Sequence, residues 1–177
     1  EKPITMILPL GAGGSHDRNA RVFTSVIPEF LGNAIIVKLM PGASGQVGTA
    51  AAARSKPDGY TLIFTHNYYD QLQKHVKKLP YNTDKDFVTV GKLNSGSFSV
   101  IVRADSPFKT WGQLVAYAKK NPGKLKFAHS GNWGATHAPA LQLFTEAGIV
   151  KDIVMVPYKG GGPSLRGFLA KEADFTF

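Results

Sequence analysis

Three glycine-rich stretches carry the residues best suited to binding chemistry. The first, Gly11-Ala12-Gly13-Gly14-Ser15, lies between an apolar run and a helical pattern. Glycine tolerates positive φ and lets a ligand approach the main chain closely, and the following helix offers unpaired N–H groups with a partial positive charge. The stretch therefore predicts a site for a carboxylate, sulfate or phosphate. The alternative is a turn that only bends the chain.

The second half of the chain repeats this device. Ser130-Gly131-Asn132-Trp133-Gly134-Ala135-Thr136-His137 joins a predicted strand to a predicted helix and offers hydroxyls, an amide and main-chain N–H groups. Tyr158-Lys159-Gly160-Gly161-Gly162-Pro163 follows another predicted strand. Open α/β sheets bind ligands at the carboxyl ends of their strands. We therefore expect one loop from each half of the chain to grip the two ends of a single small molecule.

A nucleotide is not the predicted anion. The first loop lacks the Lys-Ser/Thr ending of a phosphate loop, and its glycines do not have the G-x-G-x-x-G spacing. No acidic residue ends the second predicted strand, where Lys38 stands instead. The sequence thus predicts that no cofactor is bound.

Metal binding and catalysis have little support in the sequence. There is no cysteine, which excludes disulfides, thiolate metal sites and cysteine nucleophiles. No recognised zinc spacing is formed by the five histidines, which are His16, His66, His75, His129 and His137. Ser130 has no G-x-S-x-G frame. We predict a binding protein without enzymatic activity. The alternative is an α/β enzyme that holds an anionic substrate in the first loop, with His16 as its candidate base.

Composition limits the class of protein. The 177 residues are 43% hydrophobic and 19% charged, which is typical of a globular chain, and no apolar run reaches the length of about 18 residues that a bilayer requires. The net charge of +9 attracts anions. The basic residues are scattered, which favours a solvated surface over a nucleic-acid-binding module. Glu1-Lys2-Pro3 leads directly into an apolar run, so we expect a processed start.

Short apolar runs alternate with helical patterns, which predicts an α/β fold with parallel-rich sheets. The predicted strands are Ile4 to Pro9, Ile35 to Leu39, Tyr60 to Phe64, Val88 to Leu93, Phe98 to Arg103, Lys126 to His129, Ile153 to Pro157 and Asp174 to Phe177. The predicted helices are 16–31, 47–55, a helix capped by Thr110, 136–147 and 163–171. Pro28 should kink the first helix and Gly32 should end it.

The alternation falls into two parts. Asn94-Ser95-Gly96 is interpreted as the crossing between two lobes, 1–98 and 99–177. The chain stops on an apolar strand without a closing helix, so we expect a C-terminal part to be missing.

Six short motifs occur in order along the chain. They are Pro9 to Asp17, Pro41-Gly42-Ala43-Ser44-Gly45, Pro57 to Leu62, Leu79-Pro80-Tyr81 with Asp86-Phe87, Asn121 to Leu125, and Val156 to Gly160. On these motifs the chain resembles the extracytoplasmic solute receptors of tripartite tricarboxylate transporters, also called the Bug family. The resemblance implies a periplasmic-binding-protein-like fold of type II with a cleft between two lobes. It also implies an exported, periplasmic protein that has lost its signal peptide.

The resemblance further implies a partner set and a site. The ligand would be a small organic mono- or dicarboxylate, delivered to membrane transporter subunits without metal or nucleic acid. The implied ligand-binding residues are Gly13, Gly14, Ser15, Thr65, His66, Asn67, Ser130, Asn132, Thr136, His137, Tyr158, Lys159 and Gly160. Tyr68, Tyr69 and Trp133 stand where smaller residues are commoner in the family, so we expect a narrower pocket or one shaped for a flat ring. Tyr68 and Trp133 are candidates for stacking on a ligand, and the equal alternative is that they pack at the junction of the lobes.

Asp17 has two interpretations. As an acidic residue in the first turn of a helix, it stabilises the positive end of the helix dipole. The alternative is a contact with the ammonium group of a ligand.

Overall fold

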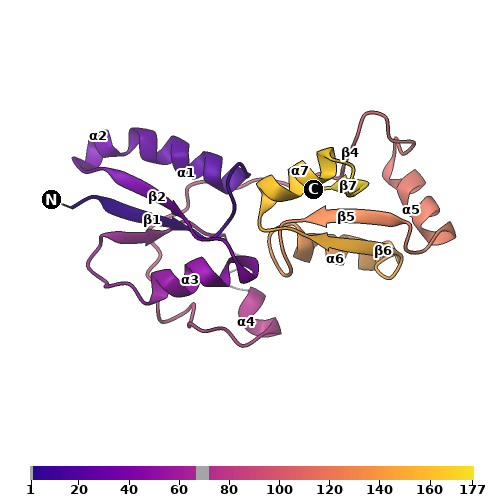
Figure 1. The fold of residues 1–177 in the computed structure, drawn as a ribbon. Helices are drawn as coiled ribbons and strands as arrows, with labels where there is room; N and C mark the ends of the chain where they lie inside the picture. Colours follow the sequence, from indigo (N-terminus) through magenta and orange to yellow (C-terminus); the bar gives the residue numbers. More distant parts are fainter. Residues whose placement is uncertain (1, 67–71) are drawn as a thin grey trace.

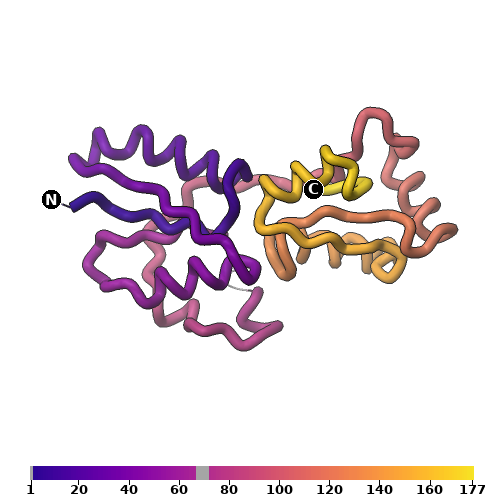
Figure 2. The backbone as a smooth tube through the Cα atoms, viewed as in Figure 1, coloured from indigo at the N-terminus to yellow at the C-terminus, as the bar shows by residue number. Residues whose placement is uncertain are grey.

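The computed structural model describes residues 2–66 and 72–177. The chain forms two α/β lobes that lie side by side (Figure 1). Figure 2 shows that the chain forms the first lobe and then crosses once to the second. The N-terminus lies at the far end of the first lobe, and the C-terminus lies in the second. The placement of the lobe boundary at residue 98 stays a prediction.

The first lobe is built on a parallel sheet of order β2-β1-β3. Its strands are β1 (Ile4–Leu8), β2 (Ile35–Leu39) and β3 (Thr61–Ile63). Its helical segments are α1 (Ser15–Val26), α2 (Pro28–Leu31), the short 3-10 turn η1 (Ala43–Gly45), α3 (Gln46–Ala53) and α4 (Gln73–Val76). Helices α1 and α2 cover one face of the sheet and α3 covers the other (Figure 1).

The first helical pattern ends as predicted but divides in two. Helix α1 stops at Val26, and Pro28 begins α2, because proline fits the first turn of a helix but not its interior. Gly32 ends α2 in the left-handed conformation with φ 66°. The break redirects the apolar stripe: Phe23 packs in the core of the lobe, whereas Phe30 is 77% exposed.

The second lobe has a mixed sheet of order β4-β7-β5-β6, in which only β4 is antiparallel. Its strands are β4 (Ile101–Val102), β5 (Leu125–His129), β6 (Ile153–Pro157) and β7 (Phe175–Thr176). Its helices are α5 (Trp111–Lys120), α6 (His137–Glu146) and α7 (Gly161–Leu169). Thr110 caps α5 as predicted, and Gln113 completes a capping box with it.

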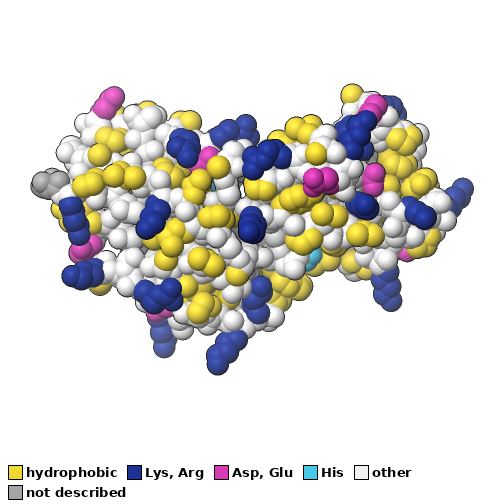
Figure 3. Space-filling view, in the orientation of Figure 1, with side chains coloured by type: hydrophobic (Ala, Val, Ile, Leu, Met, Phe, Trp, Pro, Cys, Tyr) yellow, Lys and Arg dark blue, Asp and Glu magenta, His cyan; other side chains and the backbone are white. Residues whose placement is uncertain are grey.

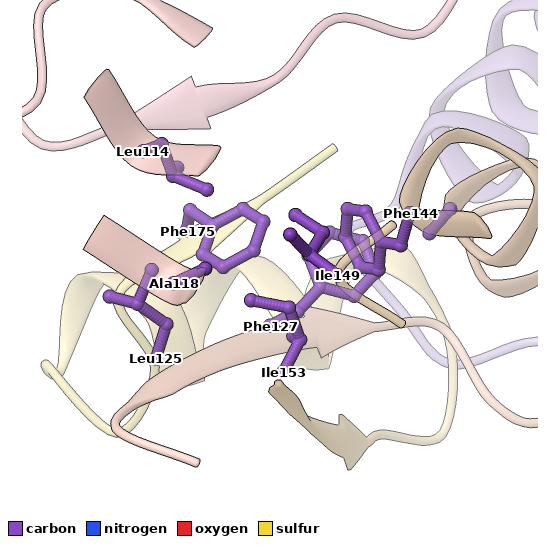
Figure 4. Packing of buried hydrophobic residues seen from close by; sticks show 9 residues of the cluster. Leu114, Ala118, Leu125, Phe127, Phe144, Ile149, Ile153 and Phe175 are labelled. Carbon is purple, nitrogen blue, oxygen red and sulfur yellow. The ribbon is translucent and has the colours of Figure 1, made fainter. Parts of the chain in front are cut away.

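Alternation along β5 assigns its side chains to two cores. Phe127 points into the larger core with Phe144 of α6 and Phe175 of β7 (Figure 4). Ala128, the next residue, faces the opposite side of the sheet and packs with Phe168 of α7. A strand buried on both faces needs apolar residues at successive positions. This is why the run from Phe127 to Ala128 does not alternate with polar residues.

Two predicted strands are wrong in whole or in part. Val88 to Leu93 forms no strand, and Val88 and Val90 are 91% and 87% exposed. The predicted strand Phe98 to Arg103 is reduced to the two residues of β4. An apolar, β-branched run indicates strand propensity, but a strand also requires a partner with free ladder groups. No such partner pairs with 88–100 among the residues the structure describes.

No helix in the described ranges combines the length and the apolar character that crossing a bilayer would require.

The larger core should carry much of the stability of the second lobe. Phe127→Ala should lower the free energy of unfolding by about 3–5 kcal/mol, because it removes a fully buried ring and leaves a cavity. Val154→Ala on neighbouring β6, where the side chain is 40% exposed, is the matched control and should cost under about 1 kcal/mol. Urea titration followed by circular dichroism measures both values. Equal costs would contradict the assigned core.

Candidate functional site

The loop after β1 is organised by a carboxylate inside the protein. Asp17, which is buried, accepts a hydrogen bond from the main-chain N–H of Gly13 at 2.9 Å and another from Arg21 Nε at 2.9 Å. The Gly13 N–H therefore has an acceptor already. No side chain of the described residues caps the first turn of α1, which begins at Ser15 after Gly14. The amides of that turn remain the positive end of the helix.

The same loop touches the second lobe through main-chain atoms. The Gly11 N–H donates to the carbonyl oxygen of Lys159 at 3.0 Å. A Cβ atom added at Gly11 would lie 2.6 Å from that oxygen, and one added at Gly14 would lie 3.0 Å from Gly162 N. A Cβ at Gly162 would overlap Ala12 O. Glycine is needed on both sides because the two main chains are in direct contact.

The loop after β5 is closed by its own side chains. The hydroxyl of Thr136 accepts the Ser130 N–H at 2.8 Å, and the two hydroxyl oxygens lie 2.9 Å apart. The Trp133 N–H donates to His137 Nδ1 at 3.0 Å. Trp133 itself takes a positive φ of 59°, which is rare for a bulky residue and marks a tightly constrained turn. Asn132 is exposed at the tip.

A cavity of about 40 Å³ lies where the loops of the two lobes meet. Its lining residues are Pro9, Leu10, Gly42, Ser44, Gly45, Ser130, Tyr158 and Lys159. A cavity of this volume has room for about three water molecules. The cavity is therefore smaller than an organic acid of several carbon atoms, and the loops of the two lobes lie close together around it.

Some predicted residues meet at this junction and others lie beside it. Gly14 lies against Gly162, and Gly131 lies near Ser44 and the carbonyl oxygen of Tyr158, so loops from both lobes converge. The Tyr158 side chain turns away, since its hydroxyl donates to Glu172 Oε2 at 2.6 Å. Partial desolvation and this bond raise the pKa of Tyr158 to about 12.

The remaining predicted residues occupy the rims. Ser15 and Lys159 are exposed, and Gly160 is buried beside Gly11. Thr65 and His66 follow β3, at the same edge of the sheet as the first loop. The rings of His66 and His16 are 5.0 Å apart. Asn67 and Tyr68 lie outside the described residues.

Sequence reasoning missed the loop after β2. Ser44 and Gly45 line the cavity, and a Cβ atom added at Gly131 would lie 3.1 Å from Ser44 Oγ. Ala43 and Ser44 both have positive φ, at 46° and 54°. The motif Gly42-Ala43-Ser44-Gly45 after a strand was the available signal, since parallel strands deliver their following loops to one edge.

Each lobe contains a pair of neighbouring histidines. The pairs are His16 with His66 in the first lobe and His129 with His137 in the second. Burial, followed by the effect of the neighbouring His16, lowers the pKa of His66 to about 3. In the second lobe His129 is fully buried, and its ring centroid is 4.5 Å from that of His137. Burial, followed by the effect of His137, lowers the pKa of His129 to about 4. Both pairs are therefore neutral at pH 7, where they act as polar packing.

Metal binding has no structural support in the described residues, among which no three His, Asp or Glu side chains are grouped to hold an ion. The Lys and Arg side chains are spread over the visible face of both lobes (Figure 3). On this face the basic side chains do not gather into the single patch or stripe that is typical of a nucleic-acid interface.

The sequence profile of the tripartite tricarboxylate transporter family receptors matches residues 19–177. The chain belongs to this family. Among curated relatives, the UPF0065 protein in the gbd 5' region of Cupriavidus necator is 34% identical over 175 residues, which cover 96% of the chain and 51% of the relative. Protein BugT of Bordetella pertussis is 32% identical over 168 residues, covering 93% of the chain and 50% of BugT. The chain thus spans about half the length of the curated relatives it matches.

A solved structure supports the two-lobed fold of the chain. MatC from Rhodopseudomonas palustris with bound malate superposes with a TM-score of 0.90 at 29% identity, over 98% of the chain and 58% of MatC. The resemblance inferred from the six motifs and the periplasmic-binding-protein-like fold are therefore confirmed. The individual ligand-binding residues stay predictions.

The main-chain contact between the lobes gives a steric prediction. Gly162→Ala should force the lobes apart, because its Cβ would overlap Ala12 O, and small-angle X-ray scattering should report a larger radius of gyration. Gly161→Ala is the matched control, since its added Cβ meets nothing within 4 Å. Identical scattering from the two variants would show that the lobes do not close on this contact.

The buried His129 predicts a loss of stability in acid. Its folded pKa of about 4 lies below the ordinary histidine value of 6.5, so the unfolded chain binds more protons between these values. The contribution of His129 to the free energy of unfolding is therefore complete above pH 6.5 and is lost as the pH falls toward 4. The free energy of unfolding falls by at most about 1.4 kcal/mol per pH unit for this group. Urea unfolding at pH 7.5, 5.5 and 4.5 measures the slope. His129→Phe should make it shallower, and an unchanged slope would assign the acid sensitivity elsewhere.

Proposed function

We propose that this chain forms the ligand-capturing lobes of a periplasmic receptor for a small organic carboxylate. The observation that carries the proposal is the convergence of four strand-end loops, two from each lobe, on one junction with a small cavity. Each lobe supplies main-chain amides and hydroxyls there. A ligand that bridges both lobes would favour the close arrangement over the separated one.

The charge at the junction supports an anionic ligand. The first turn of α1 points its unpaired amides toward this edge of the sheet, and Lys159 stands on the opposite lobe. No ion pair occupies Lys159 among the described residues. A net charge of +9 raises the local concentration of anions. The relative MatC binds malate, which is a dicarboxylate.

The family of the chain also indicates a partner and a cellular compartment. Members of the family are receptors of tripartite tricarboxylate transporters. We infer that the protein is exported to the periplasm and binds a mono- or dicarboxylate there. It would then deliver this ligand to membrane subunits of such a transporter. The family description favours capture over catalysis. His16, the candidate base of the alternative enzyme, packs its ring against Phe64 and His66.

Titration calorimetry of the intact protein tests the proposal. Malate, benzoate and glutamate represent aliphatic, aromatic and amino-acid carboxylates, and we expect at least one to bind. Its methyl ester should bind at least about tenfold more weakly, because esterification removes the charge that the amides and Lys159 would neutralise. A folded protein that binds none of the three acids, or binds ester and acid equally, would overturn the proposal.

A further inference from the structure

We propose that Ser44 is the first lobe's polar contact with the cleft ligand, and that Gln73 is the residue that positions it. The inference rests on the proposed function and adds two residues that the sequence did not single out. Ser44 lies in η1 and Gln73 begins α4, so 28 residues of chain separate Ser44 from the residue that holds its main-chain carbonyl.

Ser44 presents its hydroxyl to the opposite lobe. It lines the cavity between the lobes, and Ser130 of the second lobe lines the same cavity. The nearest atom to a Cβ added at Gly131 is Ser44 Oγ, at 3.1 Å. A hydroxyl both donates and accepts hydrogen bonds. It can therefore serve a carboxylate or hydroxyl oxygen of a ligand at this position.

The main chain at Ser44 has a left-handed conformation that is intrinsically unfavourable for a residue with a side chain. Its φ and ψ of 54° and 44° are left-handed, and the preceding Ala43 also has a positive φ of 46°. Residues with a side chain rarely adopt this region, and two in succession need support from surrounding structure. Two main-chain hydrogen bonds stabilise the turn from within. Gly45 N and Val47 N donate to Gly42 O at 2.9 and 3.4 Å.

Gln73 supplies support from outside the turn. Its side chain is completely buried, and its Nε2 donates to the carbonyl oxygen of Ser44 at 3.0 Å. Its Oε1 accepts a longer hydrogen bond of 3.5 Å from Gln46 Nε2. A buried amide is costly unless it is paired, so the side chain and the Ser44 carbonyl are held together. The carbonyl of Ser44 is thus fixed by Gln73, while the hydroxyl of Ser44 faces the cavity beside Gly131.

The ligand-free test measures amide hydrogen exchange in the intact protein. Gln73→Met keeps the length of the side chain and removes its amide, so exchange in segment 42–47 should quicken about fivefold or more. Gln46→Met is the matched control, because it removes only the 3.5 Å bond, and exchange should stay within about twofold of the parent. Equal effects of the two variants would overturn the positioning role. If Gln73→Met does not fold, Gln73→Glu replaces the donor with an oxygen and should act in the same direction.

The ligand test uses malate, benzoate and glutamate as probes. Ser44→Gly removes the hydroxyl but suits the left-handed turn, so it should weaken binding of the acid held by the parent about tenfold without speeding exchange in segment 42–47. Adding Gln73→Met to Ser44→Gly should weaken binding no further, because Gln73 acts through the hydroxyl that is already absent. Unchanged affinity in Ser44→Gly, or effects that multiply in the double variant, would overturn the proposal.

The two proposals fail in different ways. A parent protein that binds none of the three acids contradicts the carboxylate function, while the exchange comparison still decides whether Gln73 holds the turn. A parent protein that binds an acid as tightly after Ser44→Gly keeps the carboxylate function and removes Ser44 from the site.

Discussion

The hydrogen bond from the Gly11 N–H to the Lys159 carbonyl is the interaction on which the arrangement of the site depends. It joins the main chains of two lobes whose sheets do not pair with each other. Contact at this distance requires glycines at positions 11, 14 and 162, because a Cβ atom at any of them would meet main-chain atoms of the other loop. The glycines therefore serve closure of the lobes as well as access to the amides.

This contact changes how the first loop can bind an anion. Glycine-rich loops before helices are commonly treated as open cradles of N–H groups. Here Asp17 occupies the Gly13 N–H with its own carboxylate, and Gly11 N–H is bonded across the lobes. The structure agrees with the interpretation of Asp17 as a residue that organises the helix terminus. Two of the loop's main-chain N–H groups therefore already have acceptors within the protein.

The second lobe reaches the same end by a different construction. Its loop after β5 is held by side chains, through the Ser130–Thr136 pair and the bond from Trp133 N to His137. Behind it, His129 and Phe127 form one stack that leads into the apolar core. A rigid loop on a rigid core limits the reorganisation that closing on a ligand costs. The loop after β5 is thus held by its own side chains, whereas the loop after β1 is held by Asp17 and by the main-chain bond to Lys159.

The order of elements, the class of the fold and the loops that end its strands could be predicted from the sequence. Local patterns are enough for this: apolar runs of strand length, Thr110 before a helix, Pro28 inside one and Gly32 after it each act through their own main chain. The strand expected at Val88 to Leu93 failed because a strand is defined by its partner, which a local pattern does not contain. Only the tertiary structure brought Gln73 to Ser44 and Gly11 to Lys159, since contacts between distant segments depend on how sheets, helices and lobes pack in space.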